Sequence, residues 1–168
     1  MNKVLFLDRD GVINKDHHYV NQIKDFEFMD GIFELTKRFQ DMGYLIIVCT
    51  NQGGISKGYY KESDLINISE WMTQEFSKKG IKISKVYYEI SMDTNHPRRK
   101  PNPGMFLDAI KDFDVDVSKS FMVGDKISDL LAAHKAGIPN LYFLEGKYIE
   151  STHEISYHKI QKLDEVFR

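Results

Sequence analysis

Two carboxylates one residue apart follow a short apolar run near the start of the chain. The motif is Asp8-Arg9-Asp10-Gly11, and residues 4–7 before it are all apolar. In an extended strand the side chains at i and i+2 point to the same face, so both carboxylates could reach one ligand. One can attack a phosphorus atom while the other protonates the leaving oxygen and later activates water. A solvated charged turn is the alternative, and the apolar run before the motif argues against it.

Three further polar groups follow later apolar runs. Thr50 follows the second run, Lys100 lies in the loop after the third, and Asp125 follows the fourth. Ligands of open parallel sheets bind beyond the carboxyl ends of the strands, which would bring these groups together. Carboxylates bind Mg²⁺ through oxygen, and both Mg²⁺ and lysine offset the charge of a phosphate attacked by an anion. The pattern therefore predicts phosphoryl transfer with a hard cation.

Other candidates have two interpretations each. The basic residues 98–100 are either a solvated charged run or a phosphate site, in which Arg99 offers a bidentate fork. The glycine pair 53–54 either permits a tight turn or exposes backbone N–H groups to an anion. His17 and His18, taken alone, are more typical of solvated loop residues than of catalytic ones.

Apolar runs alternate with helical patterns along the whole chain. Strands are expected over 4–7, 44–49, 85–90, 121–123 and 141–144. Helices are expected over 32–42, with Asp30 as a cap, and over 63–79, 102–113, 128–136 and 163–167. Residues 11–29 have no helical period and predict a long functional loop. We expect an α/β fold in a single domain over 1–168, with a Rossmann-like open, mostly parallel sheet, helices on both faces and a minimal cap.

The composition limits the possible partners. The formal net charge is −2 over 168 residues, which gives no electrostatic reason to expect nucleic acid or an anionic membrane. No apolar run approaches the ~20 residues of a membrane-spanning helix. The early charged residues leave no apolar leader, so we expect a cytoplasmic protein. Cys49 is the single cysteine, which excludes an internal disulfide, and its place in an apolar run predicts an inert buried thiol. We expect a monomer.

The order of the motifs resembles the haloacid dehalogenase superfamily of phosphatases, over residues 4–144. Four motifs carry the resemblance: Asp8-x-Asp10-Gly11, Thr50, Lys100, and Gly124-Asp125 followed by Asp129. The resemblance implies Asp8 as the nucleophile that becomes a phosphoaspartate, and Asp10 as the general acid and base. It implies that Thr50 binds the phosphoryl oxygens and Lys100 neutralises charge. It also implies a Mg²⁺ site made by Asp8, the Asp10 backbone carbonyl and Asp125, with Asp129 as a supporting acid and not a ligand.

A closer resemblance is to the D-glycero-D-manno-heptose 1,7-bisphosphate 7-phosphatases, whose relatives include histidinol-phosphate phosphatases. It rests on residues 8–14, Tyr19-Val20, Phe26-Glu27-Phe28, residues 50–55, Arg99-Lys100-Pro101 and residues 124–126. The implied substrate is a small phosphorylated sugar. The implied substrate contacts are Asp16, His17, His18, Tyr19, Asn51, Gln52, Gly53 and Lys126, and Arg99 is implied as a catalytic residue together with Lys100.

One departure from that family concerns zinc. The family carries a zinc loop with four Cys and His ligands, and the matching places here read Glu89-Ile90-Ser91 and His96-Pro97-Arg98. His96 alone cannot make a structural site, which needs four nitrogen or sulfur ligands. We therefore predict no zinc, and the short loop leaves the exact substrate open.

Three alternatives follow from the same residues. Within the enzyme interpretation, histidinol phosphate is the second substrate, although the basic Arg99 and Lys126 favour a second phosphate over a cationic amine. A phosphate-accepting receiver module also uses Asp, Mg²⁺, Thr and Lys, but its acceptor follows the third strand instead of the first. A non-catalytic binding protein with the same fold has no support, since all the catalytic positions are intact.

Overall fold

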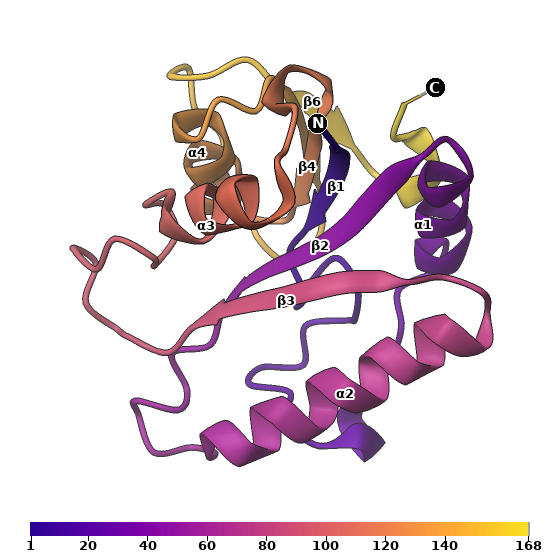
Figure 1. The fold of residues 1–168 in the computed structure, drawn as a ribbon. Coiled ribbons are helices and arrows are strands. Elements are labelled where there is room, and N and C mark those ends of the chain that lie inside the picture. The colour runs from indigo at the N-terminus through magenta and orange to yellow at the C-terminus, as the bar shows by residue number, and fades with distance from the viewer. Residues whose placement is uncertain (168) are drawn as a thin grey trace.

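Six strands form one parallel sheet in this computed structural model, which describes residues 1–167. The sheet order is β3-β2-β1-β4-β5-β6. The strands are β1 (Lys3–Leu7), β2 (Tyr44–Asn51), β3 (Ile83–Glu89), β4 (Phe121–Gly124), β5 (Asn140–Leu144) and β6 (His158–Ile160). Because every pair is parallel, the segments that follow β1, β2 and β4 meet at one edge of the sheet (Figure 1).

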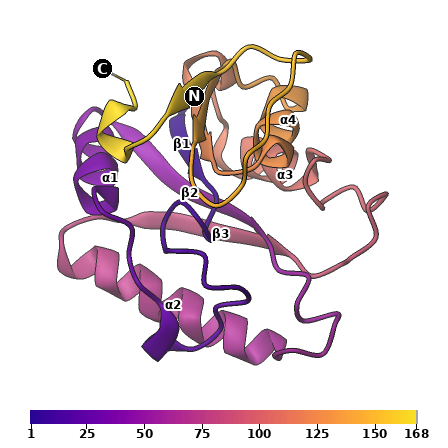
Figure 2. The ribbon, with the colours of Figure 1, turned by 180° about the vertical axis from the view of Figure 1, so that it is seen from behind.

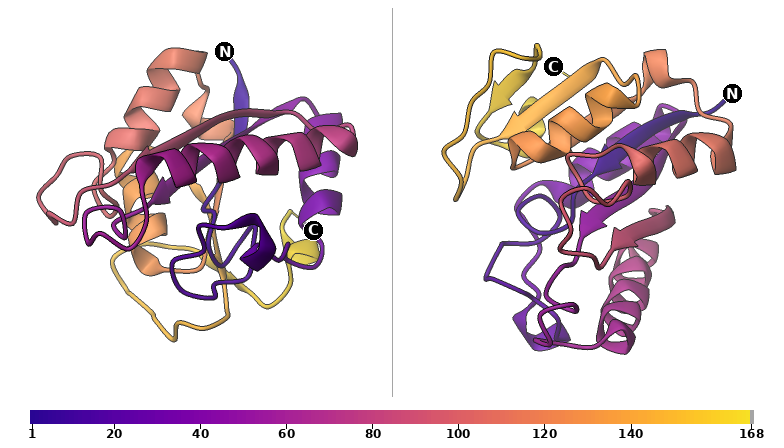
Figure 3. Two further views of the ribbon diagram at one scale, coloured as in Figure 1. Left: turned by 90° about the horizontal axis from the view of Figure 1, so that it is seen from below. Right: turned by 90° about the vertical axis from the view of Figure 1, so that its left-hand side faces the viewer.

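Four helices cover the two faces of this sheet. Helices α1 (Ile32–Asp41) and α2 (Glu62–Lys78) share one core with Leu5 and Leu7, whereas α3 (Gly104–Phe113) and α4 (Ile127–Lys135) share the other with Val4 and Phe6 (Figure 3). Alternate residues of β1 therefore serve opposite faces, and a strand buried on both sides is apolar throughout. The predicted doubly covered α/β sheet is confirmed. No helix among residues 1–167 is long and apolar enough to cross a membrane.

The loop between β1 and α1 is fixed to α2. Its only regular element is a 3₁₀ turn, Ile23–Asp25. Phe26 and Phe28 pack on Trp71 of α2 with ring centroids 5.4 and 5.7 Å apart, so the loop and the helix lie side by side (Figure 2). The loop is thus long but not free, and its first residues are held beside the strand ends.

The structure corrects three local predictions. Strand β6 was not expected, because two of its three residues are exposed and three residues are too few to show a period. The helix expected over 163–167 is a single 3₁₀ turn, Leu163–Glu165, and Phe167 lies at φ 56°, outside the helical region. Helix α1 is preceded by Gly31 at φ 85°, not capped by Asp30.

Candidate active site

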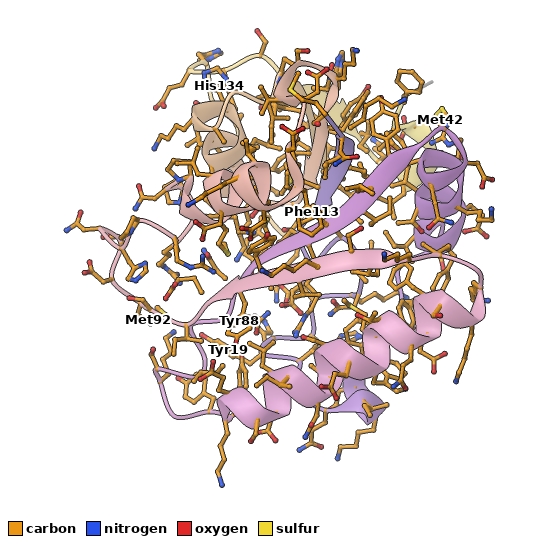
Figure 4. All side chains as sticks on the ribbon, viewed as in Figure 1. Tyr19, Met42, Tyr88, Met92, Phe113 and His134 are labelled. Atoms are coloured by element: carbon orange, nitrogen blue, oxygen red, sulfur yellow. The ribbon has the colours of Figure 1, made fainter. Side chains whose placement is uncertain are left out.

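A cavity of about 470 Å³ lies at the edge of the sheet where the strands end. Asp8, which follows β1, lies at its floor and Thr50 comes from β2. Loops from distant parts of the chain complete the wall, and Figure 4 shows Tyr19 and Met92 from two of these loops on the same side of the molecule. The further lining residues are Asp10, Asp16, His18, Asn51, Gln52, Gly53, Gly54, Lys57, Tyr60, Thr94, Arg99, Lys100, Pro101, Lys126, Ser128, Asp129 and Tyr148.

Lys100 is buried at the floor of this cavity and binds three oxygens. Its Nζ lies 2.9 Å from Asp8 Oδ1, 2.7 Å from Asp129 Oδ1 and 2.8 Å from the Cys49 backbone oxygen. Burial opposes the charge of this ammonium, but the two carboxylates outweigh it and raise the pKa of Lys100 above its ordinary value. Lys100 therefore stays charged beside Asp8, although its side chain is only 2% exposed.

Asp129 supports this lysine and caps a helix at the same time. While its Oδ1 contacts Lys100, its Oδ2 accepts from the backbone N–H groups of Asp125 and Lys126, at 3.2 and 3.1 Å. It is the third residue of α4, where a carboxylate satisfies N–H groups that lack helical partners. Both oxygens are thus already engaged. Asp129 therefore holds Lys100 and the first turn of α4 in place.

Asp10 is held as a carboxylate by a hydrogen-bond network. Its Oδ1 accepts from Arg9 Nη2 at 2.8 Å and from Asn14 Nδ2 at 2.9 Å, and its Oδ2 accepts from Gln52 Nε2 at 3.0 Å. Burial opposes ionisation, but the Arg9 charge and these hydrogen bonds outweigh it, so the pKa of Asp10 lies below its ordinary value. The network thus keeps Asp10 ionised in the free protein, which is the form that can accept a proton. A phosphate dianion close by would raise its pKa and favour the acid form.

Side chains of the turn after β2 orient one another. Gln52 Nε2 also donates to Thr50 Oγ1 at 3.0 Å, and the Tyr60 hydroxyl donates to Gln52 Oε1. Asn51 bonds the backbone of Lys100 twice, through Nδ2 to its oxygen and through Oδ1 from its N–H, both at 3.1 Å. Asn51 thus fixes the loop that carries Lys100, in addition to lining the cavity.

Three buried carboxylates could hold a cation. One oxygen each of Asp8, Asp125 and Asp129 lies within 4.8 Å of the others. Asp125 Oδ1 is buried with no hydrogen-bond partner among residues 1–167. Burial and the charges of Asp8 and Asp129 raise the pKa of Asp125 to about 9. Burial is also the largest cause of the raised pKa of Asp8, which is about 6. An orphaned oxygen among carboxylates that repel one another fits a divalent cation with oxygen ligands.

Backbone geometry leaves room for this group of carboxylates. Gly11 lies at φ 90°, and a Cβ built there would be 1.9 Å from Asp125 Oδ2. Any other residue would both strain the backbone and displace Asp125. The Asp10 backbone carbonyl, which the family resemblance implies as a Mg²⁺ ligand, accepts no hydrogen bond from the described part of the chain.

The rim of the cavity carries cations that lack acidic partners. Lys57, Arg99 and Lys126 line the cavity, and none of them pairs with a carboxylate within residues 1–167. Lys57 Nζ donates instead to the Tyr19 hydroxyl at 2.7 Å, and Arg99 Nη1 donates to the Ser91 oxygen at 2.9 Å. These charges are therefore available to an anionic ligand.

All of the predicted site residues line this cavity except Asp125 and His17. A carboxylate oxygen of Asp125 lies within 4.8 Å of oxygens of Asp8 and Asp129, which do line it. His17 is not among the lining residues; its Nε2 lies 3.3 Å from Glu27 Oε2, in a separate hollow formed by residues 17–27. His18 lines both cavities. In the basic run, Arg98 faces away from the cavity, where it pairs with Glu89 and Asp108. Sequence spacing cannot tell which of two adjacent loop residues faces the cavity, because a loop backbone has no fixed period.

Several lining or supporting residues were missed from the sequence. Arg9 is 1% exposed and donates to Asp10 and to the Val20 backbone oxygen, although it was considered only as the variable position of the motif. Tyr60 and Tyr148 each reach the cavity from segments without a motif. Lys57 stands next to the predicted residues 50–55 and could have been found by extending that motif along its loop.

The comparisons with known proteins agree with this geometry. A family model described as HAD-hydrolase-like matches residues 97–166. The structure resembles that of D,D-heptose 1,7-bisphosphate phosphatase from B. bronchiseptica complexed with magnesium and phosphate, with a TM-score of 0.82, 26% identity, and 96% and 93% of the two chains covered. The parallel sheet and its acidic edge thus define a HAD-type phosphatase.

Sequence relatives narrow the class to one family. The chain is 49% identical to D-glycero-alpha-D-manno-heptose-1,7-bisphosphate 7-phosphatase of Campylobacter jejuni, over 83% of this chain and 80% of the relative. It is 42% identical to D-glycero-beta-D-manno-heptose-1,7-bisphosphate 7-phosphatase of Pasteurella multocida, over 83% and 80%. The chain belongs to the heptose 1,7-bisphosphate 7-phosphatase family.

Proposed function

We propose that this protein removes the 7-phosphate of D-glycero-D-manno-heptose 1,7-bisphosphate through a phosphoaspartate on Asp8, with Mg²⁺ as cofactor. Family membership supports the reaction. The observation that carries the mechanism is the position of Asp8. One of its oxygens is held by Lys100 at 2.9 Å, whereas Oδ2 accepts no hydrogen bond from the described residues and is free to attack.

The first step uses Asp8 and Asp10 on one phosphoryl group. A carboxylate oxygen of Asp8 forms a bond to phosphorus, the bond from phosphorus to the sugar oxygen breaks, and protonated Asp10 gives its proton to that oxygen. In the second step Asp10 takes a proton from water, whose oxygen attacks phosphorus and releases Asp8. Thr50 and Lys100 would bind the phosphoryl oxygens, and Gln52 holds Thr50 and Asp10 in relation to each other.

The cofactor would be held by Asp8, Asp125 and the Asp10 backbone carbonyl. Mg²⁺ prefers oxygen ligands and would supply charge stabilisation for the transferring phosphoryl group. The orphaned Asp125 Oδ1 and the free Asp10 carbonyl support this assignment, and the full engagement of Asp129 supports leaving it outside the ligand set.

The free cations at the rim support a substrate with a second phosphate. Arg99 and Lys57 carry like charges that line the same cavity without carboxylate partners among residues 1–167, so they repel each other. A second phosphate would offset this repulsion, whereas the amine of histidinol phosphate would add to it. The structure therefore favours the bisphosphate.

Phosphate release tests the proposal directly. The α and β anomers of the bisphosphate, histidinol phosphate and simple sugar phosphates would be compared, each with Mg²⁺ and with a chelator. We expect Mg²⁺-dependent release that favours a heptose bisphosphate, and nearly complete loss in Asp8→Asn with an unchanged circular dichroism spectrum. Fully active Asp8→Asn would refute the mechanism. A preference for another phosphate would keep the mechanism and refute the substrate.

A further inference from the structure

A short segment after β5 closes one wall of the cavity. We call residues 147–150 the strap. Its second residue, Tyr148, lines the cavity. At its end, Glu150 Oε1 accepts from the backbone N–H of Ile127, the first residue of α4, at 2.9 Å. This is a favourable position for a carboxylate, because the first N–H groups of a helix lack partners within the helix. The strap is thereby attached to the helix that begins beside Lys126.

Tyr148 contacts two residues of the cavity that are distant in the sequence. Its hydroxyl donates to Asp16 Oδ2 at 3.1 Å. The Nζ of Lys126 lies 4.5 Å from the centre of its ring, within range of a favourable cation–π contact. Lys126 has no carboxylate partner in the described part of the chain, so the ring is what orients this charge.

Asp16 in turn fixes the turn that carries His18 and Tyr19 over the cavity. Its Oδ1 accepts from the His18 backbone N–H at 3.0 Å. His18 and Tyr19 lie at φ 62° and 52°, in the left-handed region that residues other than glycine adopt at a cost. Lys147 of the strap adds contacts to the same turn, 3.8 Å from Asp16 Oδ2 and 2.6 Å from His18 Nε2.

We infer that Tyr148 is a positioning residue that sets substrate specificity. It holds Lys126 and the turn of residues 16–19 together as one wall facing the part of the substrate remote from the transferred phosphate. This inference rests on the proposed function for the nature of that substrate. Tyr148 makes no hydrogen bond to Asp8, Asp10 or Thr50 that would involve it in the chemical step. Its removal should therefore weaken substrate binding far more than turnover.

Two substitutions separate the hydrogen bond of Tyr148 from its ring contacts. Tyr148→Phe removes the bond to Asp16 and keeps the ring beside Lys126 and Lys147, whereas Tyr148→Leu removes the bond and both ring contacts. We expect the KM for the heptose bisphosphate to rise about threefold in the first variant and about tenfold or more in the second, with smaller changes in kcat. The KM for p-nitrophenyl phosphate should change much less, because that substrate has no second anionic group for Lys126.

The matched control is Tyr157→Phe, on the same connection between β5 and β6. Its hydroxyl has no hydrogen bond among residues 1–167, and its ring packs on Phe143, so its kinetics should equal those of the wild type. Equal loss of kcat on both substrates in Tyr148→Leu, or a KM unchanged by it, would overturn the inference. The wild-type substrate panel tests the proposed function separately. If it selects another phosphate, the variant-to-wild-type KM ratios are measured with that phosphate.

Discussion

Replacing Lys100 by methionine tests how the buried charges balance one another. Methionine has nearly the same length and shape but no charge. The change removes the partners of Asp8 Oδ1 and Asp129 Oδ1, at 2.9 and 2.7 Å, and that of the Cys49 backbone oxygen. The carboxylates of Asp8, Asp125 and Asp129 would then repel one another without a compensating cation.

The size of the effect follows from the burial of the pair. The side chains of Lys100 and Asp8 are 2% and 9% exposed, so solvent screens them little. Removing one partner of a buried ion pair typically costs about 3–5 kcal/mol. For a chain of this length each kcal/mol lowers Tm by about 2–4 °C, which gives a fall of about 6–20 °C.

The pH dependence identifies the cause of this loss. Asp8 has a pKa of about 6 beside Lys100, and that pKa rises further when the lysine is absent. Protonated Asp8 needs no cation, so the difference in Tm between variant and wild type should grow from pH 5 to pH 8. Adding Mg²⁺ should reduce it, because a bound cation replaces part of the lost charge.

Thermal unfolding followed by circular dichroism measures this difference, with chelator and with Mg²⁺. Lys119→Met is the control, because Lys119 pairs with Asp116 at 3.4 Å on the surface with 65% of its side chain exposed. Its Tm should stay within about 2 °C of the wild type. A Lys100→Met variant as stable as this control, or one whose loss is the same at pH 5 and pH 8, would refute the electrostatic reasoning.

Three further outcomes are expected. Gly11→Ala places a Cβ 1.9 Å from Asp125 Oδ2, so the Mg²⁺ concentration that gives half-maximal activity should rise at least about tenfold. An unchanged Mg²⁺ titration would contradict this expectation. The Tm of the metal-free protein should fall as the pH rises from 5 to 9, because the pKa values of Asp8, about 6, and Asp125, about 9, are raised in the folded protein and ionisation of these groups removes stability. Thermal melts with chelator and with Mg²⁺ measure this fall, and the stabilisation by Mg²⁺ should grow with pH. His18→Ala should raise KM, whereas His17→Ala should keep KM and kcat within about twofold of the wild type in steady-state assays, since His17 faces Glu27 outside the cavity.

The sequence by itself determined the sheet and the positions of the candidate catalytic residues. Apolar runs that end in Asp8, Thr50 and Asp125 indicate strands buried on both faces, and parallel strands bring their carboxyl ends to one edge. Short-range patterns contain this information, because strand and helix periods are local. The same patterns were insufficient for β6 and for the last turn, whose residues are few and partly exposed.

Only the tertiary structure decided how loops without a period complete the site. In the structure His18 and Arg99 line the cavity, whereas their neighbours His17 and Arg98 do not. Tyr148 also contacts Asp16, which lies 132 residues earlier in the chain. These contacts depend on where loop backbones pack, as Phe26 does on Trp71, and not on the spacing of residue types. The balance of charge around Lys100 is likewise tertiary, because burial and distance, which set the pKa of each carboxylate, exist only in the folded chain.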